Sequence, residues 1–162
     1  MPSGKTHIRI DVFFLLLMAA AALTFWDDLV QRFGRDRLVE QSAVFTISYL
    51  FGTFLLSPDL DLKDNVSAKN WGLLRLFWRP YAALFRHRGI SHVPVLGTLT
   101  RILYMAVVAY VAVAAANVLF DMKIRMSFRD LRAANWNLGL TALAGVCLPD
   151  LLHVLTDRAF KR

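Results

Sequence analysis

The stretch that decides the fold is VLGTLTRILYMAVVAYVAVAAANVLF, residues 95–120, the strongest apolar block of the chain. A helix of this length would measure about 39 Å, whereas the hydrocarbon core of a bilayer is about 30 Å thick. Arg101 interrupts the block, about two turns from its start. The stretch therefore predicts a transmembrane helix with one arginine inside it.

Three weaker apolar stretches accompany this block. In chain order, the first span lies at the lower length limit for a bilayer span, and the second span begins with Glu40 and Gln41. The apolar pattern of the fourth span is interrupted by Pro149, Asp150 and His153. The prediction is an all-α, membrane-embedded bundle of about four transmembrane helices within a single integral membrane domain, residues 1–162. The expected spans are about 10–26, 38–56, 95–120 and 138–156.

The composition agrees with a membrane protein. Hydrophobic residues make up 57% of the 162 residues and charged residues 19%, against about 45–50% and 25% in soluble domains. The net charge of +7 would suggest nucleic acid in a soluble protein. Here we attribute it to basic loops that orient the protein and attract anionic membrane lipids, and we expect no nucleic-acid partner. A single cysteine, Cys147, excludes an intrachain disulfide.

The longest polar connection, residues 62–93, contains an amphipathic segment at 71–86. Arg75, Arg79 and Arg86 would share one helical face, and aromatic residues supply the apolar surface. Pro80 is expected to divide the segment into two short helices. Such a segment fits a helix lying in the lipid headgroup layer. The alternative is an ordinary surface helix packed on the bundle, and we favour the interfacial interpretation.

Four spans would place both termini and the 57–93 connection on the same side of the membrane. That side carries the larger share of lysine and arginine, so the positive-inside rule predicts that the termini are cytoplasmic.

The same topology gathers histidines and aspartates at one membrane face. Asp150 and His153 are three residues apart and share a helix face, which Asp157 joins four residues later. His7 and Asp11 have the same four-residue spacing. An aspartate inside a span costs about 2.5–3.5 kcal/mol, so such a residue usually has a partner or a function. The residues expected to bind metal are His7, Asp59, Asp61, His87, His92, Asp150, His153 and Asp157.

These side chains suit a divalent metal, above all zinc, which takes histidine nitrogen and carboxylate oxygen. Their number exceeds the four ligands of one tetrahedral zinc. Either two ions are bound, which we favour, or some aspartates orient the histidines without touching metal.

The motifs resemble a known family. The residues that carry the resemblance are Ser3-Gly4-Lys5-Thr6-His7, Ser57-Pro58-Asp59-Leu60-Asp61, His87-Arg88-Gly89-Ile90-Ser91-His92 and Asp150-Leu-Leu-His153. They resemble uncharacterised metal-binding membrane proteins of bacteria and the LexA-regulated membrane-bound metal-dependent hydrolases. That wider group is similar to zinc-dependent phospholipase C and P1-type nucleases. The resemblance implies metal ligands at His7, Asp59, His87, His92, Asp150 and His153, and a location in the bacterial inner membrane.

Two functions follow as hypotheses. The first is a metal-dependent hydrolase of the phosphoesterase type, acting on a phosphoester or lipid-linked substrate at the cytoplasmic membrane face. Arg88 and Arg101 would then bind phosphate oxygens, although Arg88 could equally contact lipid phosphates and Arg101 could neutralise a buried carboxylate. The second is a non-catalytic protein in which the metal is structural and holds the ends of the helices together. A scaffold without metal leaves Asp150 and His153 unexplained, and a transporter disagrees with ligands at one face.

Overall fold

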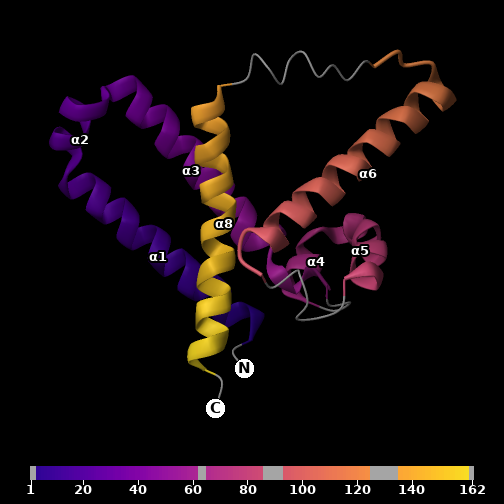
Figure 1. Ribbon diagram of the computed structural model, residues 1–162, viewed down its shortest axis with the longest axis horizontal. Helices are drawn as coiled ribbons and strands as arrows, with labels where there is room; N and C mark the ends of the chain where they lie inside the picture. Colours follow the sequence, from indigo (N-terminus) through magenta and orange to yellow (C-terminus); the bar gives the residue numbers. More distant parts are fainter. Residues whose placement is uncertain (1–2, 62–64, 86–92, 125–134, 161–162) are drawn as a thin grey trace.

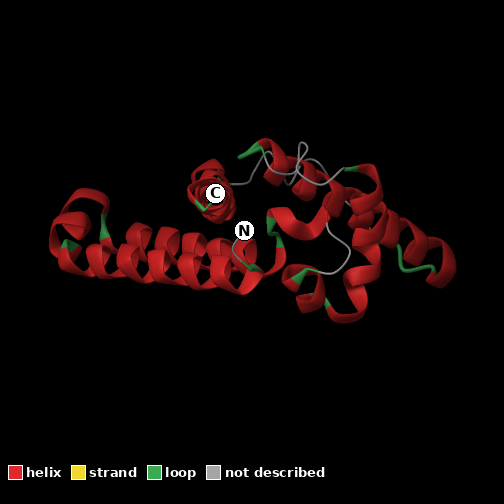
Figure 2. Cartoon of the chain, turned by 90° about the horizontal axis from the view of Figure 1, so that it is seen from below, coloured by secondary structure: helices red, strands yellow, loops and turns green. Residues whose placement is uncertain are grey.

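The computed structural model describes residues 3–61, 65–85, 93–124 and 135–160, and all regular structure in these ranges is helical (Figure 2). The four long helices are α1 (Gly4–Thr24), α3 (Arg35–Leu55), α6 (Leu96–Phe120) and α8 (Trp136–Ala159). Each is long and apolar enough to cross a membrane. The expected all-α architecture with four such helices is confirmed for the described residues.

The long helices are arranged so that several of their ends meet. Helices α1 and α3 run in opposite directions side by side, α8 crosses them, and α6 diverges from the other three (Figure 1). The start of α1 and the end of α8 lie at the same end of the molecule (Figure 1). The structure therefore brings the first turn of α1 and the last turn of α8 to one end of the molecule, as the predicted topology requires.

Two glycines allow α3 and α8 to pack closely. A Cβ atom on Gly52 would lie 3.1 Å from the carbonyl oxygen of Val146, and one on Gly145 would lie 2.8 Å from that of Phe45. Small residues at such positions let helix backbones approach each other, as they commonly do in membrane proteins. The contact fixes α8, which carries several of the predicted ligands, against α3.

One local feature differs from the sequence prediction. The charged stretch after the first span contains a short helix, α2 (Trp26–Phe33), with Asp27 and Asp28 in its first turn and Arg32 in its last. These charges complement the helix dipole. Helix α8 continues through Pro149, in agreement with the single span expected over residues 138–156.

The connection between α3 and α6 folds into short helices. They are η1 (Pro58–Asp61), α4 (Val66–Asn70), η2 (Gly72–Trp78) and α5 (Arg79–Leu84), where η denotes a 3-10 helix. Pro80 lies in the first turn of α5, which confirms the expected division at this proline. Trp78 and Tyr81 are buried among neighbouring aromatic rings, whereas Leu73 and Phe77 are exposed. The connection therefore has both an inner face packed on the bundle and an outer apolar face.

Candidate metal centre

The first histidine of the centre is placed by the start of α1. The Ser3 hydroxyl accepts a hydrogen bond from the backbone N–H of Thr6, at 3.4 Å, and so caps the helix. His7 then lies in the first two turns of α1, and only 4% of its surface is exposed. The cap thus sets where the helix begins and which way His7 faces.

The second histidine comes from the last part of α8. His153 is buried, and its ring stacks on that of His7 with centroids 3.8 Å apart and planes 17° from parallel. Two protonated imidazoles at this separation would repel each other. The stacking therefore favours at least one neutral ring, which is the form that binds metals.

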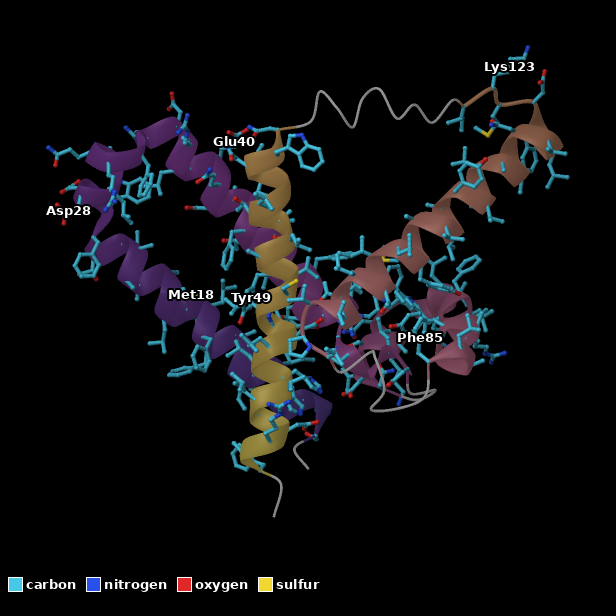
Figure 3. All side chains as sticks on the ribbon, viewed as in Figure 1. Met18, Asp28, Glu40, Tyr49, Phe85 and Lys123 are labelled. Carbon is cyan, nitrogen blue, oxygen red and sulfur yellow. The ribbon has the colours of Figure 1, made fainter. Side chains whose placement is uncertain are left out.

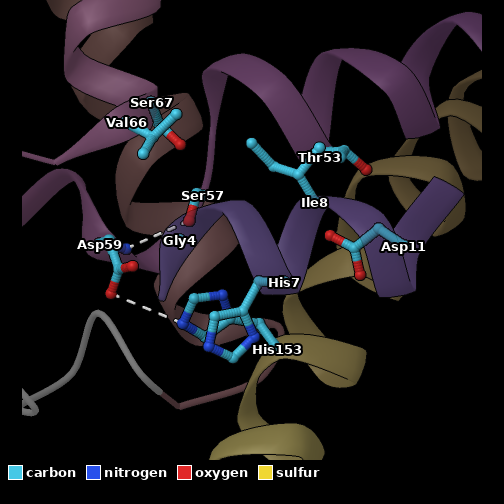
Figure 4. A pocket seen from close by; sticks show the side chains of 10 residues that line it. All are labelled: Gly4, His7, Ile8, Asp11, Thr53, Ser57, Asp59, Val66, Ser67 and His153. Carbon is cyan, nitrogen blue, oxygen red and sulfur yellow. Dashed lines mark hydrogen bonds and ion pairs between the residues drawn. The ribbon is translucent and has the colours of Figure 1, made fainter. Parts of the chain in front are cut away.

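Two carboxylates approach the stacked rings. The Nε2 atom of His7 lies 3.3 Å from Oδ1 of Asp157, and that of His153 lies 3.5 Å from Oδ1 of Asp59. Figure 4 shows the second of these contacts beside the histidine pair. One donor atom from each of His7, His153 and Asp157 can be chosen so that all three lie within 4.8 Å of one another. Residues from both chain ends thus form one group of possible metal ligands.

The loop after α3 holds Asp59 in place. The side-chain amide of Asn65 donates a hydrogen bond to the Asp59 carbonyl oxygen, at 2.5 Å. Asn65 also caps α4 by accepting from the backbone N–H of Ala68, at 2.6 Å. The same asparagine therefore ties the Asp59 turn to the next helix and directs the carboxylate towards His153.

A small cavity opens beside the histidine pair (Figure 4). It measures about 10 Å³, which is room for about one water molecule or ion. Its lining includes His7, His153, Asp59, Asp11 and Thr53. The Nδ1 atom of His7, Oδ1 of Asp11 and Oγ1 of Thr53 are buried without a hydrogen-bond partner among the described residues.

These donors fit a divalent metal. Zinc ligands lie about 2.0–2.2 Å from the ion, so two ligands of a tetrahedron are about 3.3–3.6 Å apart. The His7–Asp157 and His153–Asp59 separations of 3.3 and 3.5 Å match this spacing. Nitrogen and carboxylate oxygen are also the donor types that zinc prefers. The residues present could therefore hold a zinc-like ion with little movement.

A separate polar contact joins α6 to α8. The Arg101 guanidinium and the Thr98 hydroxyl both donate to Oδ2 of Asp150. All three residues are at most 2% exposed. Arg101 thus neutralises a buried carboxylate, which was the alternative to its predicted phosphate-binding role. The carboxylate belongs to Asp150, which the sequence predicted as a metal ligand.

Comparison with known proteins decides the family. The family model described as "Uncharacterized metal-binding protein (DUF2227)" matches residues 2–162. The chain belongs to this family. A relative in Aquifex aeolicus (strain VF5), described as an uncharacterized protein, is 38% identical over 122 residues, which are 70% of this chain and 86% of the relative. No solved structure matches.

Membership of a metal-binding family bears out the metal-binding part of the sequence prediction. It also agrees with the resemblance to uncharacterised metal-binding proteins, whereas no comparison supports the wider likeness to LexA-regulated hydrolases or P1-type nucleases. The identity of the metal and any reaction remain predictions.

The predicted ligands fall into four groups. His7, Asp59, His153 and Asp157 meet around the stacked rings, whereas Asp150 pairs with Arg101. Asp61 is buried in η1. His87, Arg88 and His92 lie outside the described residues, so their roles stay predictions.

Sequence reasoning missed two threonines and underrated one aspartate. Thr53 lines the cavity from α3, and no sequence signal singles it out. Thr98 lies three residues before Arg101, a spacing that puts both on one helix face and could have indicated a shared partner. Asp11 was suggested only by its spacing from His7, yet it is buried and lines the cavity.

Proposed function

We propose that the chain is an integral membrane protein that holds a divalent metal ion, zinc in the first place, between His7, His153 and Asp157. The observation that carries the proposal is the meeting of donor atoms from the two chain ends within 4.8 Å of one another. Asp59 lies beside His153 and would act as a fourth ligand or as its hydrogen-bond partner.

The simpler alternative is a histidine–carboxylate cluster held by hydrogen bonds alone. It would leave the carboxylates of Asp59 and Asp157 balanced only by two stacked imidazoles that cannot readily both be charged. A bound cation would offset the charge of the carboxylates that gather here. The family description points the same way.

A membrane location is supported by the surface of the helices. In the most apolar 18-residue stretch of α6, no residue is buried inside the protein. In the corresponding stretches of the other three long helices, at most 33% of the residues are buried. Figure 3 shows the side chains along much of α6 projecting away from the other helices. Lipid would cover these surfaces, since soluble proteins rarely expose such large apolar areas.

The connection before α6 would lie in the headgroup layer of the same membrane face. Its exposed surface combines Leu73, Leu74 and Phe77 with the exposed Arg75 and Arg79. Apolar side chains would enter the acyl region while the arginines contact anionic headgroups. The larger share of lysine and arginine on this side supports a location of this face and the metal centre in the cytoplasm of a bacterial cell.

Hydrolysis of a phosphoester or lipid-linked substrate is a second candidate function. The observation that favours it is the cavity beside the histidine pair, because a catalytic metal keeps a position open whereas a structural one is closed. A bound divalent metal would supply Lewis-acid activation of water near neutral pH. The chain's own residues would orient the substrate and exclude bulk water.

Metal content tests the first proposal. Protein purified in detergent should contain about one zinc or similar ion per chain. Asp157→Asn should weaken binding about 10- to 100-fold or more, whereas Asp28→Asn on α2 should not change it. An ion-free wild type that also fails to take up added Zn²⁺ would refute the proposal.

Activity tests the second function separately. Wild type should hydrolyse a phosphodiester or a phospholipid, and chelator should abolish the activity. Tight metal binding without turnover of any such substrate would support the structural role and exclude this hydrolase.

A further inference from the structure

Helix α1 forms one wall of the metal centre. Gly4, His7, Ile8 and Asp11 line the cavity from α1, and the other lining residues come from α3, the connection after it and α8 (Figure 4). A hydrated divalent ion carries several water molecules, whereas the cavity has room for about one. An ion that enters the centre therefore needs one of the walls to move.

The wall formed by α3 and α8 is tightly packed. The backbones of the two helices approach each other at Gly52 and Gly145, where an added Cβ atom would lie 3.1 and 2.8 Å from a carbonyl oxygen of the other helix. The buried residues of α8 extend from Gly145 to Thr156, which includes His153. These two helices are therefore the fixed part of the centre.

Helix α1, by contrast, is buried only in its first turns. His7 and Asp11 are its buried residues, and no residue of the helix after Asp11 is buried. Exposed apolar side chains such as Phe13, Leu16 and Leu23 follow. Lipid tails are about as apolar as these side chains, so a movement of α1 within the bilayer would cost them little.

The contacts that dock α1 cluster around the metal centre. Apart from the contacts of His7 with α8, the hydroxyl of the buried Tyr49 on α3 donates a hydrogen bond to the backbone carbonyl oxygen of Asp11, at 2.9 Å. The start of the helix also lies against α4, because a Cβ atom on Gly4 would be 3.1 Å from Cγ2 of Val66. Docking of α1 therefore depends on a few contacts near the histidine pair.

The other end of α1 offers a joint. Phe25 separates α1 from α2, and Gly34 separates α2 from α3, at the end of the molecule farthest from the metal centre (Figure 1). Gly34 has a φ of 81°, which glycine adopts readily, and there is open space where its Cβ would lie. The first turns of α1 could thus swing about this joint while the helix stays in the membrane.

We propose that α1 is the movable wall of the metal centre, and that its first turns separate from α8 to admit the ion and dock again when the ion is bound. The inference rests on the proposed metal site, because His7 is the ligand that α1 supplies to His153 and Asp157 on α8. A bound cation compensates the carboxylates that meet the stacked imidazoles, and so favours the docked position. An ion that binds only the docked form and is present at 100 times its Kd would raise the ratio of docked to separated molecules about 100-fold.

Distances between spin labels test the movement in the full-length protein in lipid nanodiscs. Arg9→Cys on α1 and Leu155→Cys on α8 place the labels at exposed positions, in a Cys147→Ala background. The control pair combines Leu155→Cys with Ile47→Cys, which is exposed on α3. Metal-stripped and zinc-loaded samples are compared by double electron–electron resonance, and zinc is measured in the same samples. Zinc should move the α1–α8 distances from a longer to a shorter population, by about 100-fold in their ratio, and should leave the α3–α8 distances unchanged.

The outcomes separate the movement from the site. Zinc uptake with the same α1–α8 distances in both samples would overturn the movable wall and leave the metal site intact. An equal shift of the α3–α8 distances would also overturn it, because the whole bundle would then loosen. No zinc uptake would refute both proposals.

The rate of zinc release from unlabelled protein is the second measurement, should a labelled variant not fold. Tyr49→Phe removes the hydrogen bond that docks α1 and changes none of the proposed ligands. It should speed zinc release to a chelator about 2- to 10-fold. The matched control, Tyr110→Phe at an exposed position of α6, should release zinc at the wild-type rate. An unchanged rate in Tyr49→Phe would overturn the movable wall.

Discussion

The buried Arg101–Asp150 pair gives the sharpest prediction on stability. Both side chains lie at the α6–α8 contact, with 0% and 3% of their surface exposed. Gly97, Thr98 and Arg101 are the buried residues of α6, so this pair is a large part of what attaches that helix. Removing one member of a buried ion pair costs about 3–5 kcal/mol, because it leaves the other charge without compensation. Asp150→Leu should therefore raise the unfolding constant by a factor of about 100 to 5,000.

The double variant Arg101→Met/Asp150→Leu separates a structural pair from a ligand. Replacing both charges with apolar residues is often neutral or stabilising, so most of the lost stability should return. Zinc content should also stay at the wild-type level if Asp150 serves only Arg101 and Thr98.

The assay is reversible unfolding in mixed detergent micelles, followed by circular dichroism, with zinc measured on the same samples. The exposed pair Lys123–Asp121, with 80% and 84% of the side-chain surface exposed, is the control. Asp121→Asn should leave unfolding unchanged. Additive losses in the double variant would refute a compensating pair, and loss of zinc would restore Asp150 as a ligand.

Three other perturbations test the fold and the centre. Gly145→Ala should destabilise the protein by about 1–3 kcal/mol, because the added Cβ would meet Phe45 and Ser48 on α3. The control Gly139→Ala, which has open space around it, should be neutral or slightly stabilising. Equal effects of the two variants on unfolding in micelles would contradict the close packing of α3 and α8. Chelation should lower the melting temperature, since an ion present at 100 times its Kd contributes about 2.7 kcal/mol; an unchanged melting curve would mean that the metal does not stabilise the fold. His87→Ala or His92→Ala should remove metal, and unchanged metal content in both variants would exclude these histidines as ligands.

The helices could be predicted because their signal is local. A run such as residues 95–120 is too long and too apolar to be anything other than a buried or membrane helix. Helix α2 has only eight residues and many charges, so no comparable pattern marks it. Pro149 lies inside α8 without ending it, as the single span predicted over residues 138–156 requires. Its ring would lie 3.4 Å from a Cβ atom added to Gly52, so α8 packs closely on α3 at the proline, and tertiary packing outweighs the usual penalty of a helical proline.

The site could be predicted only in part, because a sequence gives the membrane face of a residue but not its partner. Counting spans was enough to expect His7 near Asp157, although almost the whole chain separates them. The sequence also predicted Asp150 as a metal ligand and Arg101 as a phosphate-binding residue, whereas in the structure the two residues pair with each other. Which neighbour faces each residue depends on the rotation and tilt of two helices, and neither is encoded in a local pattern.

Charge balance explains why these aspartates need different partners. Asp150 meets a permanently charged guanidinium, so that pair is neutral without any ion. Asp11, Asp59 and Asp157 instead gather around two stacked imidazoles that cannot readily both be charged. If ionised, the three carboxylates bring three negative charges to one buried site, and a single divalent ion would leave one of them uncompensated. The surplus of carboxylate over imidazole therefore favours cation binding at the histidine pair.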